Sequence, residues 1–290
     1  MTVEECRQFY AREILFAANL TTPGLVGAFA KVPRETFLGL APWQLGSADL
    51  RAMAFAGAAQ VSYLSVDDPR DVYHNVVVTR DRAKDINNGQ PSALGRWIDA
   101  LFIKPGESAY HVGCGVGYYT AIIAETVGPR GRVVGLELQR ELAARAKRNL
   151  ESYTNVRIEE GDGATFDPGE CDAMLVNCGV THPQSIWLDR LREGGRLVLP
   201  ITTATSPTLG QGLMIKVVRT AAAYSAELVS PVGIYSGASL RDPTLEPQLL
   251  QGLKNGSLLG LRSVRRVVHE KSDTCVVHRP DVCLSLIPSA

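Results

Sequence analysis

Three glycines at alternating positions, Gly113, Gly115 and Gly117, are the strongest chemical signal in the sequence. They follow an apolar stretch that ends at Val112 and precede a stretch typical of a helix. Glycine permits positive φ angles and close backbone approach, and the N–H groups at a helix N-terminus attract negative charge. This segment, which includes Cys114, therefore predicts a site for a nucleotide-like ligand.

The spacing of these glycines disfavours a nicotinamide or flavin site. Such sites use G-x-G-x-x-G, and the position of the third glycine in that pattern holds Tyr118. A dehydrogenase is therefore a poor interpretation of the motif.

Two acidic positions follow at the ends of the next predicted strands. Glu137, followed by Leu138, lies about 20 residues after the glycines, where a carboxylate can accept hydrogen bonds from both hydroxyls of a ribose. Asp162 and Gly163 follow the next strand, and Asn177 ends the one after it. The alternative is that these glycines only form turns of an α/β fold and that the acidic residues only lie on its surface. Features at several successive strand ends favour the cofactor site instead.

The elements that must position these residues alternate regularly between strand and helix. Apolar runs predict strands at 108–112, 132–136, 156–159, 172–177 and 196–200. Helices are expected between them at 118–127, 139–150 and 183–191, with Gly194-Gly195 as a stop. This order predicts an α/β, doubly wound, Rossmann-like and mostly parallel sheet, in which ligands bind beyond the carboxyl ends of the strands.

The flanks of this core follow other patterns. Apolar residues at steps of three and four predict a helix from Val3 to Leu20, and a second helix should run to about Lys31. Residues 40–75 indicate irregular structure with a short Ala-rich helix. Residues 212–218 predict an antiparallel edge strand, and the stretch Pro231 to Gly237 should lie near the ligand crevice. One helix and three strand-like runs follow, too patterned for a disordered tail.

These patterns predict three regions along the chain. Residues 1–90 form an N-terminal helical region with a polar loop, 91–220 the ligand-binding core, and 221–290 a C-terminal extension packed on the core. No internal repeat interrupts this order.

Bulk composition excludes several classes of function. Thirty basic residues balance thirty acidic ones, so charge gives no attraction to nucleic acid or to an anionic membrane. The N-terminus is polar and no apolar run is long enough to span a bilayer. The six cysteines include no C-x-x-C pair, so neither a metal site nor a disulfide framework is predicted. We expect a cytoplasmic protein with reduced thiols; its oligomeric state is left open.

The motifs together resemble those of class I methyltransferases. HVGCGVGYYTAIIAE, VVGLEL, EEGDGA, DAMLVNCGV and LREGGRLVLP are similar to the successive motifs of the protein-L-isoaspartate O-methyltransferase family. VPRETF and INNGQP resemble its N-terminal signature and its loop before the first core helix. The similarity extends over about residues 20–205.

The resemblance implies S-adenosylmethionine as cofactor and S-adenosylhomocysteine as product. It implies contacts from residues of the glycine turn and the following strand ends: Val112, Gly113, Cys114, Gly115, Gly117, Glu137, Leu138, Asp162, Gly163 and Asn177. Two positions depart from the family. Gly89 replaces a serine that lies beside the substrate carboxylate, and His111 stands where an acidic residue is usual. A serine at position 89 is therefore expected to raise isoaspartyl activity.

Methyl transfer to a carboxylate needs no general base, because that acceptor is already ionised at pH 7. The main requirement is to position the acceptor carboxylate, and neutral hydrogen-bond donors suit that task. Asn88 and Gln90 are the candidates, although a polar turn before a helix explains them equally well. His182 could act as a base toward a hydroxyl or amine, but an ordinary loop histidine is the more frequent case.

Three functions remain open at this point. The first is O-methylation of a carboxylate on a peptide or protein, as the resemblance implies. The second is methylation of a small molecule on the same fold, which Gly89 and the C-terminal extension favour. The third is a catalytically silent protein that binds S-adenosylmethionine.

Overall fold

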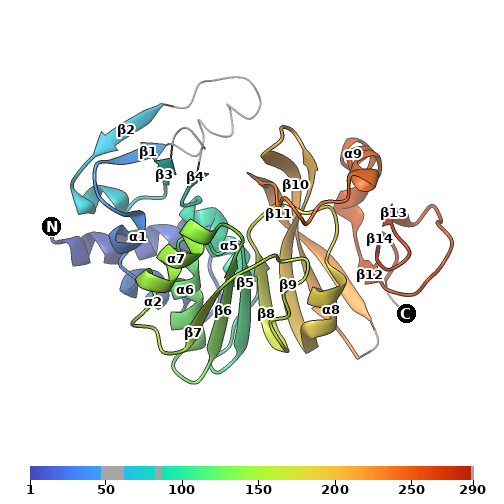
Figure 1. The fold of residues 1–290 in the computed structure, drawn as a ribbon, viewed down its shortest axis with the longest axis horizontal. Coiled ribbons are helices and arrows are strands. Elements are labelled where there is room, and N and C mark those ends of the chain that lie inside the picture. The colour runs from blue at the N-terminus through green and yellow to red at the C-terminus, as the bar shows by residue number, and fades with distance from the viewer. Residues whose placement is uncertain (47–61, 82–85, 222, 289–290) are drawn as a thin grey trace. The chain divides into compact units, whose positions relative to one another are not determined.

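The computed structural model describes residues 1–46, 62–81, 86–221 and 223–288 (Figure 1). Its contacts form two compact units that interleave along the chain. The first is Met1–Gly106, Cys114–Val133 and Arg140–Ile158, and the second is Glu107–Gly113, Val134–Gln139 and Glu159–Ala290. The chain alternates between these units several times, and the division at residues 90 and 220 stays a prediction.

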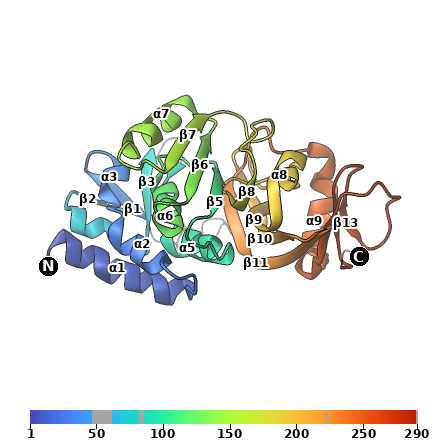
Figure 2. The ribbon, with the colours of Figure 1, turned by 90° about the horizontal axis from the view of Figure 1, so that it is seen from below.

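The first unit begins with α1 (Val3–Ala18), as the apolar period predicts. Thr2 caps it, since the Thr2 hydroxyl accepts the Glu5 N–H at 3.1 Å while the Glu5 carboxylate accepts the Thr2 N–H at 2.7 Å. Helix α1 packs against α2 (Leu25–Lys31) and α5 (Pro91–Ala100), and α2 packs against α6 (Tyr118–Val127) (Figure 2). The unit also contains α3 (Glu35–Leu38) and α7 (Arg140–Asn149).

A small sheet of order β2-β1-β3-β4 also belongs to the first unit. Its members are β1 (Trp43–Gly46), β2 (Tyr63–Val66), β3 (Val77–Asp81) and β4 (Ile86–Asn87), with the 3₁₀ turn η1 (Pro69–Val72) between β2 and β3. Strands β1 and β2 were not expected from the sequence, which indicated irregular structure there. The expected Ala-rich helix lies outside the described residues.

A large sheet of order β13-β14-β12-β11-β10-β9-β8-β5-β6-β7 lies mostly in the second unit. Strand β8 (Cys171–Val176) pairs in parallel with β5 (Ser108–Val112) and with β9 (Leu191–Ala204). The remaining strands are β6 (Arg132–Glu137), β7 (Val156–Glu160), β10 (Leu209–Arg219), β11 (Tyr224–Tyr235), β12 (Ser263–Arg265), β13 (Cys275–His278) and β14 (Cys283–Ser285). The predicted Rossmann-like α/β sheet with antiparallel strands at one side is confirmed.

Two predictions about this sheet need correction. Pairing of β9 with β8 begins at Leu191, and the register shifts before Arg196. The Gly194-Gly195 pair is therefore an irregularity inside the strand and not the end of a helix. Strand β10 is antiparallel, as predicted, but it is not an edge, because β11 pairs with its other side.

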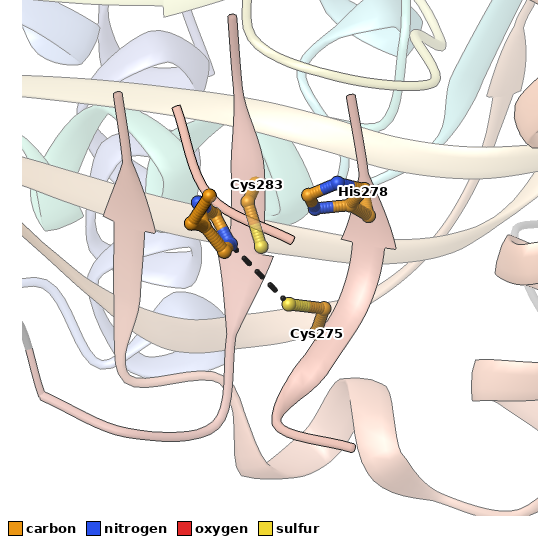
Figure 3. A group of neighbouring side chains, drawn as sticks. Cys275, His278 and Cys283 are labelled. Atoms are coloured by element: carbon orange, nitrogen blue, oxygen red, sulfur yellow. Dashed lines mark hydrogen bonds between the residues drawn. The ribbon is translucent and has the colours of Figure 1, made fainter. Parts of the chain in front are cut away.

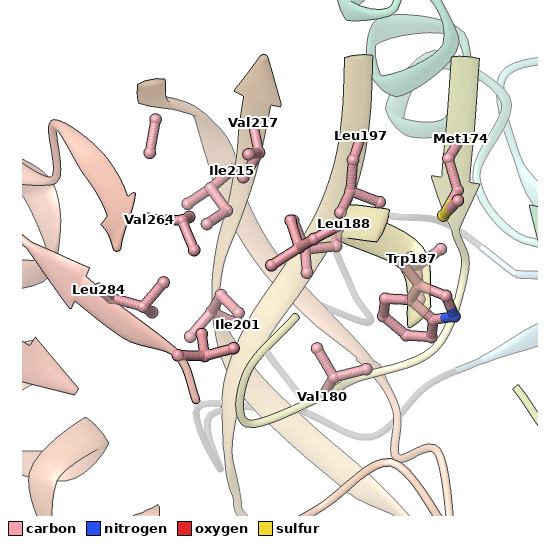
Figure 4. Close-up of a cluster of buried hydrophobic side chains, with 14 of the residues drawn as sticks. Met174, Val180, Trp187, Leu188, Leu197, Ile201, Ile215, Val217, Val264 and Leu284 are labelled. Carbon is pink, nitrogen blue, oxygen red and sulfur yellow. The ribbon is translucent and has the colours of Figure 1, made fainter. Parts of the chain in front are cut away.

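The C-terminal extension shares one hydrophobic core with the central strands of its unit. Trp187 and Leu188 of α8 (Ser185–Arg190) lie in a cluster with Ile215 of β10 (Figure 4). Val264 and Leu284, from β12 and β14, belong to the same cluster. The extension also contributes η2 (Pro243–Leu245), α9 (Glu246–Lys254) and η3 (Ser257–Gly260). The extension adopts an ordered structure because its apolar side chains complete this core.

Among the described residues, no helix combines the length and apolar character that crossing a membrane requires.

Candidate active site

The glycine turn, residues 113–117, connects β5 to α6. All three of its glycines have positive φ angles, +73° at Gly113, +59° at Gly115 and +93° at Gly117. A Cβ at Gly113 would lie 3.3 Å from the carbonyl oxygen of Asn177, and one at Gly117 would lie 2.6 Å from Leu150 Cδ1. The turn thus requires glycine by both conformation and space. A Cβ at Gly115 would meet no other described atom within 4 Å, which leaves its backbone accessible to a ligand.

Backbone hydrogen bonds bring the ends of β5, β6 and β8 together. The Gly113 N–H donates to the Leu136 carbonyl at 2.8 Å, and the Asn177 N–H donates to the Val112 carbonyl at 2.8 Å. Gly161, directly after β7, donates its N–H to the carbonyl of Glu137 at 3.1 Å. The predicted cofactor residues of this unit therefore lie at one edge of the sheet, beyond the carboxyl ends of the strands.

Glu137 is the last residue of β6 and only 7% exposed. Its Oε1 accepts the N–H of Gln139 at 2.9 Å, which fixes the carboxylate at the strand end. Leu138, between them, is 51% exposed and can lie against a ligand. A carboxylate held in this way suits a pair of ribose hydroxyls, and that role stays a prediction.

Asp162 and Gly163 are held tightly in the loop after β7. The Asp162 carboxylate accepts the N–H of Ala164 at 2.8 Å and a hydrogen bond from the Ser239 hydroxyl. The Gly163 carbonyl accepts the Trp187 indole N–H at 2.9 Å. A Cβ at Gly163 would lie 2.9 Å from Val112 Cγ1, so only glycine fits against the end of β5.

Cys178 lies among these acidic groups, directly after Asn177. Burial, together with the negative charges of Glu137 and Asp162, raises the pKa of its thiol to about 12. The thiol is therefore neutral at pH 7 and a poor nucleophile. The same two carboxylates make this edge of the sheet electrically favourable for a cationic ligand.

His111 is fully buried in the middle of β5. Burial lowers its pKa to about 3, so the imidazole is neutral at physiological pH. It cannot replace the charge of the acidic residue that is usual at this position.

His182 is 6% exposed, and its Nδ1 lies 2.9 Å from the Thr181 hydroxyl. That hydroxyl also accepts the N–H of Asp242 at 2.9 Å. Burial and the nearby Arg279 lower the pKa of His182 to about 4. An imidazole with this pKa is a weak base, which favours a loop-positioning role over that of a general base.

Asn88 and Gln90 lie in the first unit, in the loop before α5. Asn88 donates its N–H to the Val78 carbonyl at 2.9 Å and is 9% exposed. Its buried Nδ2 has no hydrogen-bond partner among the described residues, so it offers a neutral donor. Gln90 donates its amide N–H to the Ser92 hydroxyl at 3.3 Å. Gly89, between them, has φ +69°.

Sequence reasoning placed residues 235–237 near the site but missed residues 238–240. Gly179 donates its N–H to the Tyr235 carbonyl at 2.6 Å, and Gly237 donates to the Gly179 carbonyl at 2.9 Å. A Cβ at Gly237 would lie 3.1 Å from Cys178 Sγ. The expected proximity of Pro231 to Gly237 to the strand ends is thus confirmed at its last residues. The contact of Ser239 with Asp162 carries no signal in the sequence.

Comparison with known proteins identifies the chain's relatives. The family model described as Protein-L-isoaspartate(D-aspartate) O-methyltransferase matches residues 62–223. An Aeropyrum pernix protein-L-isoaspartate O-methyltransferase is 37% identical over 204 residues, covering 69% of this chain and 68% of the relative. The Ignicoccus hospitalis enzyme is 26% identical, covering 79% of this chain and 96% of the relative. The Thermotoga maritima enzyme is 31% identical over 56% of this chain, and the match spans about half of that relative, 53%.

Solved structures show the same fold. A protein-L-isoaspartate O-methyltransferase structure superposes with a TM-score of 0.65 at 23% identity, covering 83% of this chain and 69% of that one. A Plasmodium falciparum structure of this enzyme class, in complex with S-adenosyl-L-homocysteine, superposes with a TM-score of 0.51 at 16% identity. It covers 80% of this chain and 97% of that one.

Proposed function

The chain belongs to the protein-L-isoaspartate(D-aspartate) O-methyltransferase family, and from that premise we propose that it methylates a carboxylate oxygen on a peptide or protein. Its cofactor is S-adenosylmethionine, which supplies a methyl group on a positively charged sulfur. The relatives' names suggest that the acceptor is the carboxylate of an isoaspartyl residue. We expect this activity in the cytoplasm, toward a peptide and not a nucleic acid.

The observation that carries the proposal is the backbone hydrogen bonding that holds Gly113, Glu137 and Gly161, which precedes Asp162, at adjacent strand ends of the second unit. Glu137 would hold the ribose hydroxyls, Asp162 would face the adenine amino group, and the accessible backbone at Gly115 would approach the ligand. The two carboxylates that raise the pKa of Cys178 also favour a cationic cofactor over its neutral-sulfur product. That preference assists product release.

The residues of this chain then have to orient the acceptor and exclude water. An acceptor carboxylate is ionised at pH 7, so no proton has to be removed. The buried amide of Asn88 can donate to such a carboxylate without forming an ion pair, and Gln90 can assist it. The neutral, hydrogen-bonded His182 is consistent with a reaction that needs no base.

A second candidate, methylation of a small molecule, is favoured by Gly89. Its φ of +69° and the 2.9 Å distance from a built Cβ to Leu94 Cδ2 mean that this loop is shaped for glycine and not for the family's serine. A different acceptor group would explain the loss of the hydroxyl.

One experiment separates these acceptors. The full chain is incubated with methyl-labelled S-adenosylmethionine and either an isoaspartyl peptide, its aspartyl counterpart or a metabolite extract. We expect label on the isoaspartyl peptide alone, released as methanol by mild base because a carboxyl ester hydrolyses readily. Base-stable label, or label only on small molecules, would contradict carboxyl methylation of peptides. Label on nothing, despite calorimetric binding of the cofactor, would indicate a silent binding protein.

A further inference from the structure

Two cysteines and two histidines converge in the C-terminal extension, away from the methyltransferase residues in sequence. Cys275 and His278 lie on β13, Cys283 lies on β14, and His269 lies on the segment between β12 and β13 (Figure 3). Each offers one potential ligand atom, and these four atoms all lie within 4.8 Å of one another. The rings of His269 and His278 have centroids 4.9 Å apart.

His269 is held in the tautomer that a metal ligand needs. Its Nδ1 lies 2.7 Å from the carbonyl oxygen of Val267. A carbonyl can only accept, so Nδ1 carries the hydrogen and donates it. The lone pair is then on Nε2, which lies 3.4 Å from the sulfur of Cys275. Backbone carbonyls orient metal-bound histidines in this same way.

His278 has a buried polar atom without a partner. Its Nδ1 is buried and has no hydrogen-bond partner within the described ranges. Its backbone is fixed, since its N–H donates to Gln248 Oε1 at 3.0 Å. A buried polar atom without a partner costs free energy, and a bound cation would remove that cost.

Hydrogen bonds already position the sulfur of Cys275. The N–H of Ser272 lies 3.4 Å from Cys275 Sγ, and the Ser272 hydroxyl lies 3.5 Å from the same sulfur. Cys283 is buried, and its sulfur lies within 4.8 Å of the Cys275 sulfur. Thiolates are the ligand form of cysteine.

We propose that His269, Cys275, His278 and Cys283 form a structural zinc site. Tetrahedral zinc with bonds of about 2.3 Å to sulfur and about 2.0 Å to nitrogen places its ligand atoms roughly 3.3–3.8 Å apart. The cluster needs to contract by about 1–1.5 Å at its widest pair, from 4.8 Å, to reach this geometry. Two thiolates neutralise the ion, so the site buries no net charge. Four protein ligands leave no open position, which distinguishes it from a catalytic site.

The site would join β13 and β14 to the segment between β12 and β13, and these strands have only three or four residues each. Short strands contribute few ladder hydrogen bonds, so a crosslink among them adds substantial stability. Cys275 and Cys283 could otherwise be joined as a disulfide. They are not directly opposite, because Cys275 pairs with Ser285 and Cys283 with His278.

The test is the metal content of the full chain, expressed without a histidine tag in zinc-supplemented medium and purified without chelators. We expect about one zinc per chain by elemental analysis and native mass spectrometry. After exchange to Co²⁺, we expect the visible bands of a tetrahedral site with sulfur-to-cobalt charge transfer. Cys283→Ser and His278→Gln should weaken metal binding at least about tenfold. Cys6→Ser and His74→Gln, far from the cluster in sequence, are the matched controls and should keep the metal.

Wild-type protein settles the proposal even if the cluster variants fail to fold. A folded wild-type chain that holds no zinc and takes up no Co²⁺ after reduction would overturn it. A mass lower by two hydrogens, mapped to a Cys275–Cys283 disulfide in freshly purified protein, would overturn it as well. None of these measurements involves S-adenosylmethionine, so the result is independent of the proposed activity.

Discussion

Single residues at the cofactor edge of the sheet can be tested by binding. Replacing Glu137 with alanine removes a buried carboxylate that hydrogen bonds to the Gln139 N–H and is placed for a ribose. We expect Glu137→Ala to weaken S-adenosylmethionine binding by about 1–3 kcal/mol, the range for a charged hydrogen bond. Isothermal titration calorimetry measures this. Glu141→Ala, an exposed acid at the start of α7, should bind as the wild type does; equal affinities for all three proteins would remove Glu137 from the site.

Gly89 is the position at which the fold predicts a cost for serine. A serine here would have to adopt φ +69°, and its Cβ would lie 2.9 Å from Leu94 Cδ2. The expected gain in isoaspartyl activity stays a prediction. We expect Gly89→Ser to lower the free energy of unfolding by about 1–2 kcal/mol or more. Gly106→Ser, also at positive φ but with nothing within 4 Å, should cost less. Urea unfolding compares them, and a Gly89→Ser protein as stable as the wild type would show that the loop accommodates serine.

The buried His111 predicts a pH dependence of stability. Its pKa is about 3 in the folded chain and about 6.5 when unfolded. The unfolded chain therefore binds more protons between these values, and stability falls as the pH drops below 6.5. At pH 5 this residue alone should cost roughly 2 kcal/mol relative to pH 7.5. His182, with its pKa lowered to about 4, acts in the same direction.

Urea unfolding at several pH values tests this dependence. We expect His111→Gln to flatten the loss of stability between pH 7.5 and pH 5, whatever its effect on absolute stability. His74→Gln, at an exposed position, should leave the slope unchanged. A wild-type slope retained in His111→Gln would assign the pH dependence to other groups.

At the scale of elements, the segment that follows β11 links the antiparallel half of the sheet to the cofactor residues. Ser239 donates to Asp162, and Gly237 pairs with Gly179 after β8. We expect Ser239→Ala to weaken cofactor binding by about 0.5–1.5 kcal/mol, because Asp162 loses one of its orienting hydrogen bonds. Ser225→Ala, exposed on β11, is the control for calorimetry. Tighter or unchanged binding in Ser239→Ala would mean that this contact does not position Asp162.

At the scale of the whole molecule, the C-terminal extension completes the core of its unit. Leu249 of α9 is fully buried in the same cluster as Ile215 and Trp187. We expect Leu249→Ala to cost about 2–5 kcal/mol of stability, and Leu259→Ala, at a position 59% exposed, to cost little. Deletion after residue 240 should give a chain that aggregates or loses its near-ultraviolet circular dichroism. A truncated chain that remains folded and active would show that the extension is dispensable.

The sequence alone determined the methyltransferase core. Gly113, Gly115 and Gly117 each need positive φ, and strand and helix periods are local properties that a short window of sequence contains. The order of strand ends then places Glu137 and Asp162 at one edge, because parallel strands end on the same side.

Only the tertiary structure decided which side chains lie next to one another. His269, Cys275, His278 and Cys283 match no familiar metal-binding spacing, and strand pairing between β13 and β14 brings them together. Ser239 reaches Asp162 across 77 positions of sequence. Leu94, five positions after Gly89, closes off the space that a side chain there would need. Such contacts depend on how the chain folds back on itself, and residue type and local spacing do not encode that geometry.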